Sequence, residues 1–150
     1  MKRTFLLVLL VAATVLPAAA QDILGAGIIL GEPTGISVKA WLDEGMAADA
    51  AVAWSFMGDS SLYIHANALY HINVLDTGSE NYLAPYLGVG ANLRFGNDLG
   101  LGLRVPIGVS LLLNVAPVEL FAEFSPGIGL LPETGFDPGA GLGARFYFPL

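Results

Sequence analysis

The sequence predicts an all-β protein in which eight antiparallel strands close into a barrel. Three observations lead to this prediction. The composition is apolar without a long apolar run, apolar and polar residues alternate in eight segments, and the charges inside those segments share one face.

Residues 1–20 have the features of a signal peptide. Lys2 and Arg3 precede an apolar run from Phe5 to Leu16, and Ala18-x-Ala20 offers a small-residue cleavage site. That run is too short for a spanning helix, and Pro17 follows it directly. We expect cleavage between Ala20 and Gln21 and a single barrel domain over residues 21–150. The chain has no Cys, so it offers neither a disulfide nor a lipidated cysteine.

The composition is too apolar for an ordinary water-soluble domain. Hydrophobic residues make up 55% of the chain and charged residues only 13%, with a net charge of −7. The negative charge argues against nucleic acid as a partner, because phosphate binding needs a basic surface. After residue 20 the best apolar stretch, Leu99–Leu113, is interrupted by Arg104 and Pro106. A membrane protein without apolar helices must be a closed barrel, so an up-and-down transmembrane β-barrel is predicted.

Alternation with a period of two runs through eight segments separated by turn residues. Most approach the length of roughly 9–11 residues that a tilted membrane strand needs, and eight is an even number, as expected for bacterial single-chain barrels. Pro85, Pro106 and Pro126 fall inside segments and are expected to mark bulges or kinks. The segments are Ile23–Gly31, Ile36–Leu42, Ala47–Phe56, Leu62–Ile72, Tyr82–Phe95, Leu99–Leu113, Val118–Leu130 and Gly139–Phe148.

The charged residues inside these segments fall on the face opposite to the apolar one. In Val118–Leu130, for example, Glu119 and Glu123 alternate with Leu120 and Ala122. A small barrel has room inside only for its own side chains, and buried charges must be paired. The alternation therefore predicts a structural ion-pair network that plugs the lumen; a polar conduit is the alternative. Its predicted members are Lys39, Asp49, Arg94, Arg104, Glu119, Glu123 and Arg145.

No residue pattern predicts catalysis or a metal site. Glu119 and Glu123 would lie about 13 Å apart along a strand, wider than the roughly 5–9.5 Å between glycosidase carboxyls. His65 and His71 would lie about 20 Å apart and cannot share a metal ion. Ser60 and Ser61 beside His65 allow a lipid hydrolase only as a minor alternative. We expect no catalytic residues, no metal, no cofactor and no enzyme.

The signal peptide, the eight alternating segments, the charged lumen and the end Arg145-Phe146-Tyr147-Phe148 resemble the small eight-stranded outer membrane barrels, such as OmpX and the transmembrane domain of OmpA. The resemblance implies the outer membrane of a Gram-negative-type bacterium, with outer membrane lipids as surroundings. It also implies that the aromatic last strand is read by the barrel assembly machinery. The oligomeric state is left open.

The resemblance leaves the role in the envelope open. With the N-terminus in the periplasm, the outer connections near residues 31–35, 57–61, 96–98 and 131–138 are all short. Adhesins and receptors of this family usually use long outer loops. We therefore predict a structural or envelope-integrity role, with a narrow channel for ions or small solutes and a lipid-modifying enzyme as alternatives. A lipocalin-like carrier would be apolar inside, whereas this chain is polar inside.

Overall fold

The computed structural model describes residues 24–55, 61–72, 75–76 and 81–148. The predicted signal peptide, the strand end at Phe56 and the candidate nucleophile Ser60 lie outside these residues. No helix in the described part of the chain is long and apolar enough to cross a membrane.

The described chain is built from strands. Their bounds are β1 (Leu24–Glu32), β2 (Thr34–Trp41), β3 (Met46–Ser55), β4 (Ser61–His71), β5 (Leu75–Asp76), β6 (Tyr82–Phe95), β7 (Leu99–Arg104), β8 (Ile107–Leu113), β9 (Val118–Ser125), β10 (Gly127–Leu131), β11 (Gly135–Phe136) and β12 (Gly139–Phe148).

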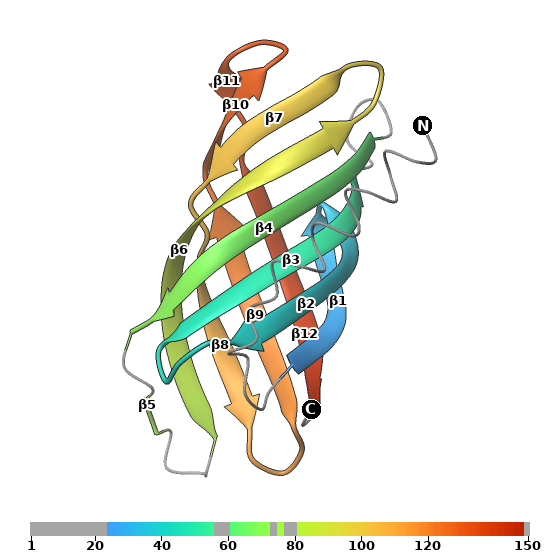
Figure 1. Ribbon diagram of the computed structural model, residues 1–150. Coiled ribbons are helices and arrows are strands. Elements are labelled where there is room, and N and C mark those ends of the chain that lie inside the picture. The colour runs from blue at the N-terminus through green and yellow to red at the C-terminus, as the bar shows by residue number, and fades with distance from the viewer. Residues whose placement is uncertain (1–23, 56–60, 73–74, 77–80, 149–150) are drawn as a thin grey trace.

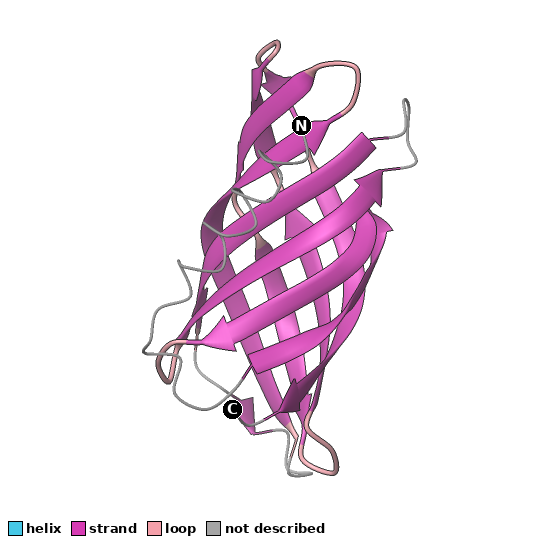
Figure 2. Ribbon diagram, turned by 45° about the vertical axis from the view of Figure 1, so that its right-hand side comes forward, coloured by secondary structure: helices cyan, strands magenta, loops and turns pink. Residues whose placement is uncertain are grey.

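These strands close into one antiparallel barrel (Figures 1 and 2). Strands β7 and β8 lie end to end, and both pair with the long β6. Strands β9 and β10 also follow one another, with β9 beside β8 and β10 beside β7. The β7–β8 pair and the β9–β10 pair therefore each count as one barrel strand. The short β5 and β11 are additions at the ends. Closure comes from β1 and β12, which pair from Leu24↔Phe148 to Glu32↔Ala140. The predicted eight-stranded antiparallel barrel is confirmed.

Two of the predicted continuous strands are each broken at a proline. Pro106 separates β7 from β8 and Pro126 separates β9 from β10, because proline has no N–H to give to the ladder. Their carbonyls still accept across the gap, Pro106 from Gly88 N at 2.8 Å and Pro126 from Val105 N at 2.9 Å. Pro85 stays inside β6, opposite Val109. The breaks preserve the alternation, since Arg104 and Ser110 are both buried on either side of Pro106.

Burial follows the predicted period of two. In β4 the residues alternate between buried and more exposed positions along its whole length. The exposed side chains on the outer wall are mainly apolar, which is the pattern of a barrel with its apolar face outward. They include Ile28, Leu30, Ile36, Val52, Trp54, Tyr70, Leu87, Val89, Leu103, Ile107, Phe124, Ile128, Leu142 and Phe146.

The two ends of the barrel differ in height. We call the end that carries the β1–β2, β6–β7 and β11–β12 connections the upper end, as Figure 1 draws it at the top. There β7 and the β10–β11 hairpin rise well above the end of β1 (Figure 1). At the lower end Ala47, Leu69 and Tyr86 form a small buried apolar cluster, with Trp41 packed against it.

Large inward side chains lie against glycines of the neighbouring strand. A Cβ atom on Gly143 would lie 2.2 Å from the Phe121 ring and 2.5 Å from the Ile28 carbonyl oxygen. One on Gly108 would lie 2.4 Å from the Tyr86 ring. These glycines leave the space that the aromatic rings occupy.

We predict that Gly143→Ala destabilises the folded barrel by about 1–3 kcal/mol, because the added methyl group collides with both a ring and a backbone oxygen. The measurement is the denaturant midpoint of unfolding in detergent, followed by heat-modifiable migration on a gel. Gly135→Ala is the matched control, since a Cβ atom there meets nothing within 4 Å. Equal midpoints for the two variants would contradict the packing argument.

Candidate functional site: the polar interior of the barrel

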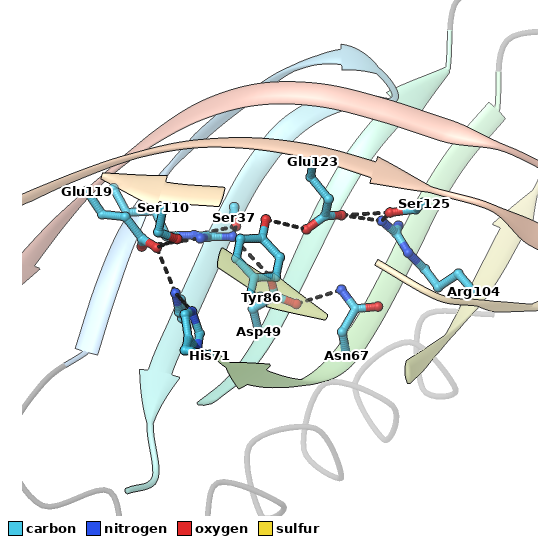
Figure 3. A network of polar contacts seen from close by, with 12 residues as sticks. Ser37, Asp49, Asn67, His71, Tyr86, Arg104, Ser110, Glu119, Glu123 and Ser125 are labelled. Atoms are coloured by element: carbon cyan, nitrogen blue, oxygen red, sulfur yellow. Dashed lines mark hydrogen bonds and ion pairs between the residues drawn. The ribbon is translucent and has the colours of Figure 1, made fainter. Parts of the chain in front are cut away.

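The barrel interior holds equal numbers of buried cationic and anionic side chains among the described residues. The cations are Lys39, Arg104 and Arg145, and the anions are Asp49, Glu119 and Glu123. All six project inward from five strands, and Figure 3 shows most of the resulting network. An isolated charge at such depth is costly, so the pairing decides whether the arrangement is tolerable.

Glu119 of β9 is the centre of the lower part of the network. Its Oε1 accepts from Lys39 Nζ at 2.7 Å and from the Ser110 hydroxyl. Its Oε2 accepts from the Tyr147 hydroxyl and from Arg145 Nη1 at 3.3 Å. Four donors from β2, β8 and β12 therefore satisfy one carboxylate that is fully buried.

Arg145 of β12 extends this centre across the lumen. Its Nη2 donates to Asp49 Oδ2 at 3.0 Å, and both Nε and Nη2 donate to the Ser37 hydroxyl at 3.0 and 2.8 Å. The guanidinium carbon also lies 3.9 Å from the centroid of the Phe121 ring, close enough for a cation–π contact. Asp49 receives a further hydrogen bond from Asn67 Nδ2 at 2.6 Å.

Lys39 is held among aromatic rings near the lower end. Besides Glu119, its Nζ lies 3.0 Å from His71 Nε2 and 4.5 Å from the Trp41 ring centroid. The His71 ring in turn packs between Trp41 and Tyr86, with centroid distances of 4.3 and 5.3 Å. The ammonium group therefore has partners on several sides and is fully buried.

Glu123 of β9 forms a second centre above the first. Its Oε1 accepts from Arg104 Nη2 at 2.6 Å and from the Ser125 hydroxyl at 2.8 Å, while Oε2 accepts from the Tyr86 hydroxyl at 2.9 Å. Figure 3 shows the two glutamates on either side of Tyr86. The interior thus contains two stacked carboxylate centres.

Arg94 differs from the sequence-based expectation. It was predicted to join the lumen network, but its side chain is 44% exposed and pairs instead with Asp137 at 2.8 Å, near the upper end. The physical reason is its position at the end of β6, where the residues that follow β11 reach it. Its absence from the interior leaves the buried charges balanced.

The two histidines, His65 and His71, belong to the barrel interior. His65 and His71 are both buried, and His71 contacts Lys39. Within residues 24–55, 61–72, 75–76 and 81–148, no group of three or more His, Cys, Asp or Glu side chains could hold a metal ion. Ser61, the described neighbour of His65, lies at the start of β4.

Several buried polar atoms in the upper half of the interior have no hydrogen-bond partner. They belong to neighbouring positions of the ladder, since Asn67 and Arg104 flank Gly90, and His65 pairs with Asn92. Buried polar atoms of this kind are normally satisfied by ordered water. The atoms are His65 Nδ1, Asn67 Oδ1, Asn92 Nδ2, Arg104 Nε and Arg104 Nη1.

Three serines belong to the network in addition to its predicted members. Ser37, Ser110 and Ser125 each contact a buried charge. The signal was present, because each serine has the inward parity of its strand. A hydroxyl carries no charge, however, so parity alone gives no reason to select it.

The fold is similar to that of solved outer membrane barrels. The N-terminal β-barrel domain of Pseudomonas aeruginosa OprF superposes with a TM-score of 0.66 at 15% identity, over 85% of this chain and 98% of that chain. Neisserial surface protein A (NspA) gives a TM-score of 0.51 at 19% identity, over 85% of this chain and 96% of that chain. No family model and no curated protein matches the sequence. At these identities the similarity establishes the eight-stranded barrel fold.

We predict that Glu119→Gln costs about 3–5 kcal/mol of folding stability, because Lys39 and Arg145 lose their shared buried counter-charge. The check is the shift of the denaturant midpoint in detergent or lipid. Glu133→Gln, an exposed change of the same chemistry, is the control. If the two variants unfold at the same midpoint, Glu119 is solvated and the pairing argument fails.

Arg94→Gln is predicted to change stability by no more than about 1 kcal/mol, because an exposed ion pair gains little in water. The same unfolding assay tests it beside Arg104→Gln, which breaks the buried pair with Glu123. A larger loss for Arg94→Gln than for Arg104→Gln would reverse this ranking.

Proposed function

We propose that this chain is an outer membrane β-barrel with a structural or envelope-integrity role, its lumen plugged by charged side chains. The observation that carries the proposal is the combination of an apolar outer wall with a buried, charge-balanced interior. A water-soluble barrel has a polar outer wall, whereas the outer wall of this barrel is apolar. A lipid bilayer is the surrounding that suits an apolar outer wall.

The proposed location is the outer membrane of a Gram-negative-type bacterium. Support comes from the fold shared with the OprF domain and NspA. The proposed partners are outer membrane lipids around the apolar wall and, during biogenesis, the barrel assembly machinery reading the last strand. On that strand Phe146 and Phe148 both point outward.

A structural role agrees with the way the interior is filled. Each carboxylate centre is bonded by donors from several strands, so the side chains tie the wall together rather than lining a free passage. The main alternative is a narrow channel for ions or small solutes. The unpartnered polar atoms around Asn67, Asn92 and Arg104 favour it, because they suit water in the upper half of the lumen.

An enzymatic role has weaker support. A lipid-modifying barrel needs a nucleophile and a base that reach lipid, whereas His65 and His71 are buried in the interior. We therefore propose a protein without catalytic activity. Incubation with outer membrane lipids followed by mass spectrometry tests this proposal. A shortened or acylated lipid product would support the lipid-modifying enzyme instead.

The membrane role is tested by fractionation of the native host with heat-modifiable migration of the recovered protein. We expect recovery with the outer membrane, and a deletion strain that becomes sensitive to detergents or other envelope stress. Recovery as a soluble periplasmic protein would overturn the proposal.

We predict that the purified barrel conducts poorly in planar bilayers, because passage requires separating ion pairs in a lumen of low dielectric. Glu123→Ala, which removes the upper centre, is expected to conduct no more than the wild type while the Glu119 centre remains intact. Stable, single-size conductance steps in the wild type that vanish in Arg104→Ala would move the channel to first place.

A further inference from the structure

The lower part of the interior brings a lysine and a histidine into direct contact. Lys39 Nζ lies 3.0 Å from His71 Nε2 and 2.7 Å from Glu119 Oε1. An ammonium group has only donors, so Nε2 of His71 must accept the hydrogen bond while Lys39 is charged by its pair with Glu119. The ring proton then lies on Nδ1. The contact therefore requires a neutral His71.

The charges around this contact are already balanced. Lys39 and Arg145 pair with Glu119 and Asp49, at 2.7, 3.3 and 3.0 Å. A proton on His71 would add a third positive charge to two buried carboxylates, and an uncompensated buried charge is costly. The titratable and charged side chains of this region are Lys39 of β2, Asp49 of β3, Tyr86 of β6, Glu119 of β9, and Arg145 and Tyr147 of β12.

His71 lies at the lower end of the barrel, next to exposed carboxylates. It is the last residue of β4, and its backbone N–H donates to the Gly45 carbonyl of the β2–β3 turn at 2.7 Å. That turn also carries Asp43 and Glu44, both exposed. Among the described residues, His71 Nδ1 has no hydrogen-bond partner, and water normally satisfies such an atom. The ring is therefore the member of the network that ends its strand beside an acidic rim.

We propose that the contact between Lys39 and His71 is a pH-sensitive switch. Protonation of His71 breaks the contact, moves the ring toward the lower rim and admits water to that end of the lumen. The ring leaves its place between Trp41 and Tyr86, where its centroid distances are 4.3 and 5.3 Å. Lys39 stays on Glu119, because that pair has opposite charges.

The direction of the switch follows from the form of the ring that the contact accepts. A neutral imidazole accepts from the Lys39 ammonium, whereas an imidazolium would place two cations 3.0 Å apart. The contact is therefore lost as the pH falls, and a return to neutral pH restores it. The lower end is closed at neutral pH and hydrated in acid.

Trp41 reports on this switch because it packs against both members. The chain has two tryptophans, and Trp54 is exposed on the outer wall, so Trp54→Phe leaves Trp41 as the single reporter. The full barrel, folded in detergent, is titrated from about pH 8 to about pH 3, which covers the range of histidine titration in proteins. We expect Trp41 emission to move to longer wavelength and its quenching by acrylamide to increase in acid, both reversibly.

His71→Gln in the same background tests the assignment. The glutamine amide oxygen can still accept from Lys39 but takes up no proton, so the acid response should disappear. His65→Gln is the control, because His65 is also buried on β4 but its ring packs on Tyr63. That variant should respond to acid as the parent barrel does.

Heat-modifiable migration establishes that each variant folds. If His71→Gln does not fold, His71→Phe replaces it, since phenylalanine keeps a ring between Trp41 and Tyr86 and cannot be protonated. A response that persists in a folded His71 variant would assign the titration to the carboxylates and refute the switch. No change in Trp41 emission or quenching in the parent barrel over this pH range would refute it as well.

The switch goes beyond the proposed envelope role and is tested apart from it. The titration needs only the folded barrel, whereas the envelope role is tested by fractionation and by the deletion strain. A barrel that fractionates with the outer membrane but whose Trp41 does not respond to acid refutes only the switch.

Discussion

The rest of the structure depends on the complete satisfaction of the Glu119 carboxylate. This charge lies in an interior that water reaches poorly, where an unpaired carboxylate would cost several kcal/mol. Its four donors come from β2, β8 and β12, so the interaction ties the early strands of the chain to the late ones. It acts across the same lumen whose wall the β1–β12 ladder closes. Backbone closure and side-chain pairing therefore support one another.

The long side chains that surround the two glutamates need space inside the barrel, and glycines on neighbouring strands leave that space. Arg145 reaches Glu119 and Asp49 while it lies over the Phe121 ring. That ring occupies the place where a side chain on Gly143 would stand. Tyr86, which donates to Glu123, lies over Gly108 in the same way. An eight-stranded barrel has little interior volume, so a small neighbour across the ladder makes room for a ring such as that of Phe121 or Tyr86.

The fold and the inward faces were predictable because a strand alternates with a fixed period. That period placed Lys39, Asp49, Arg104, Glu119, Glu123 and Arg145 on the inner face without knowledge of strand pairing. Pairing partners depend on register and on the ends of the wall, which alternation does not encode. Arg94 has inward parity, yet it lies near the end of β6, where Asp137 reaches it from a distant part of the chain. The breaks at Pro106 and Pro126 follow from a missing N–H, but their exact positions in the ladder required the structure.

Among the described residues, most of the buried polar atoms without a protein partner lie in the upper half of the interior. In the lower half, Lys39 and Arg145 are bonded to Glu119, and a solute could pass only by separating these ions inside a low dielectric. In the upper half, polar atoms of Asn92 and Arg104 have no protein partner, so a guest or water there gains hydrogen bonds without breaking any ion pair. The energetically accessible exchange is therefore with the upper end.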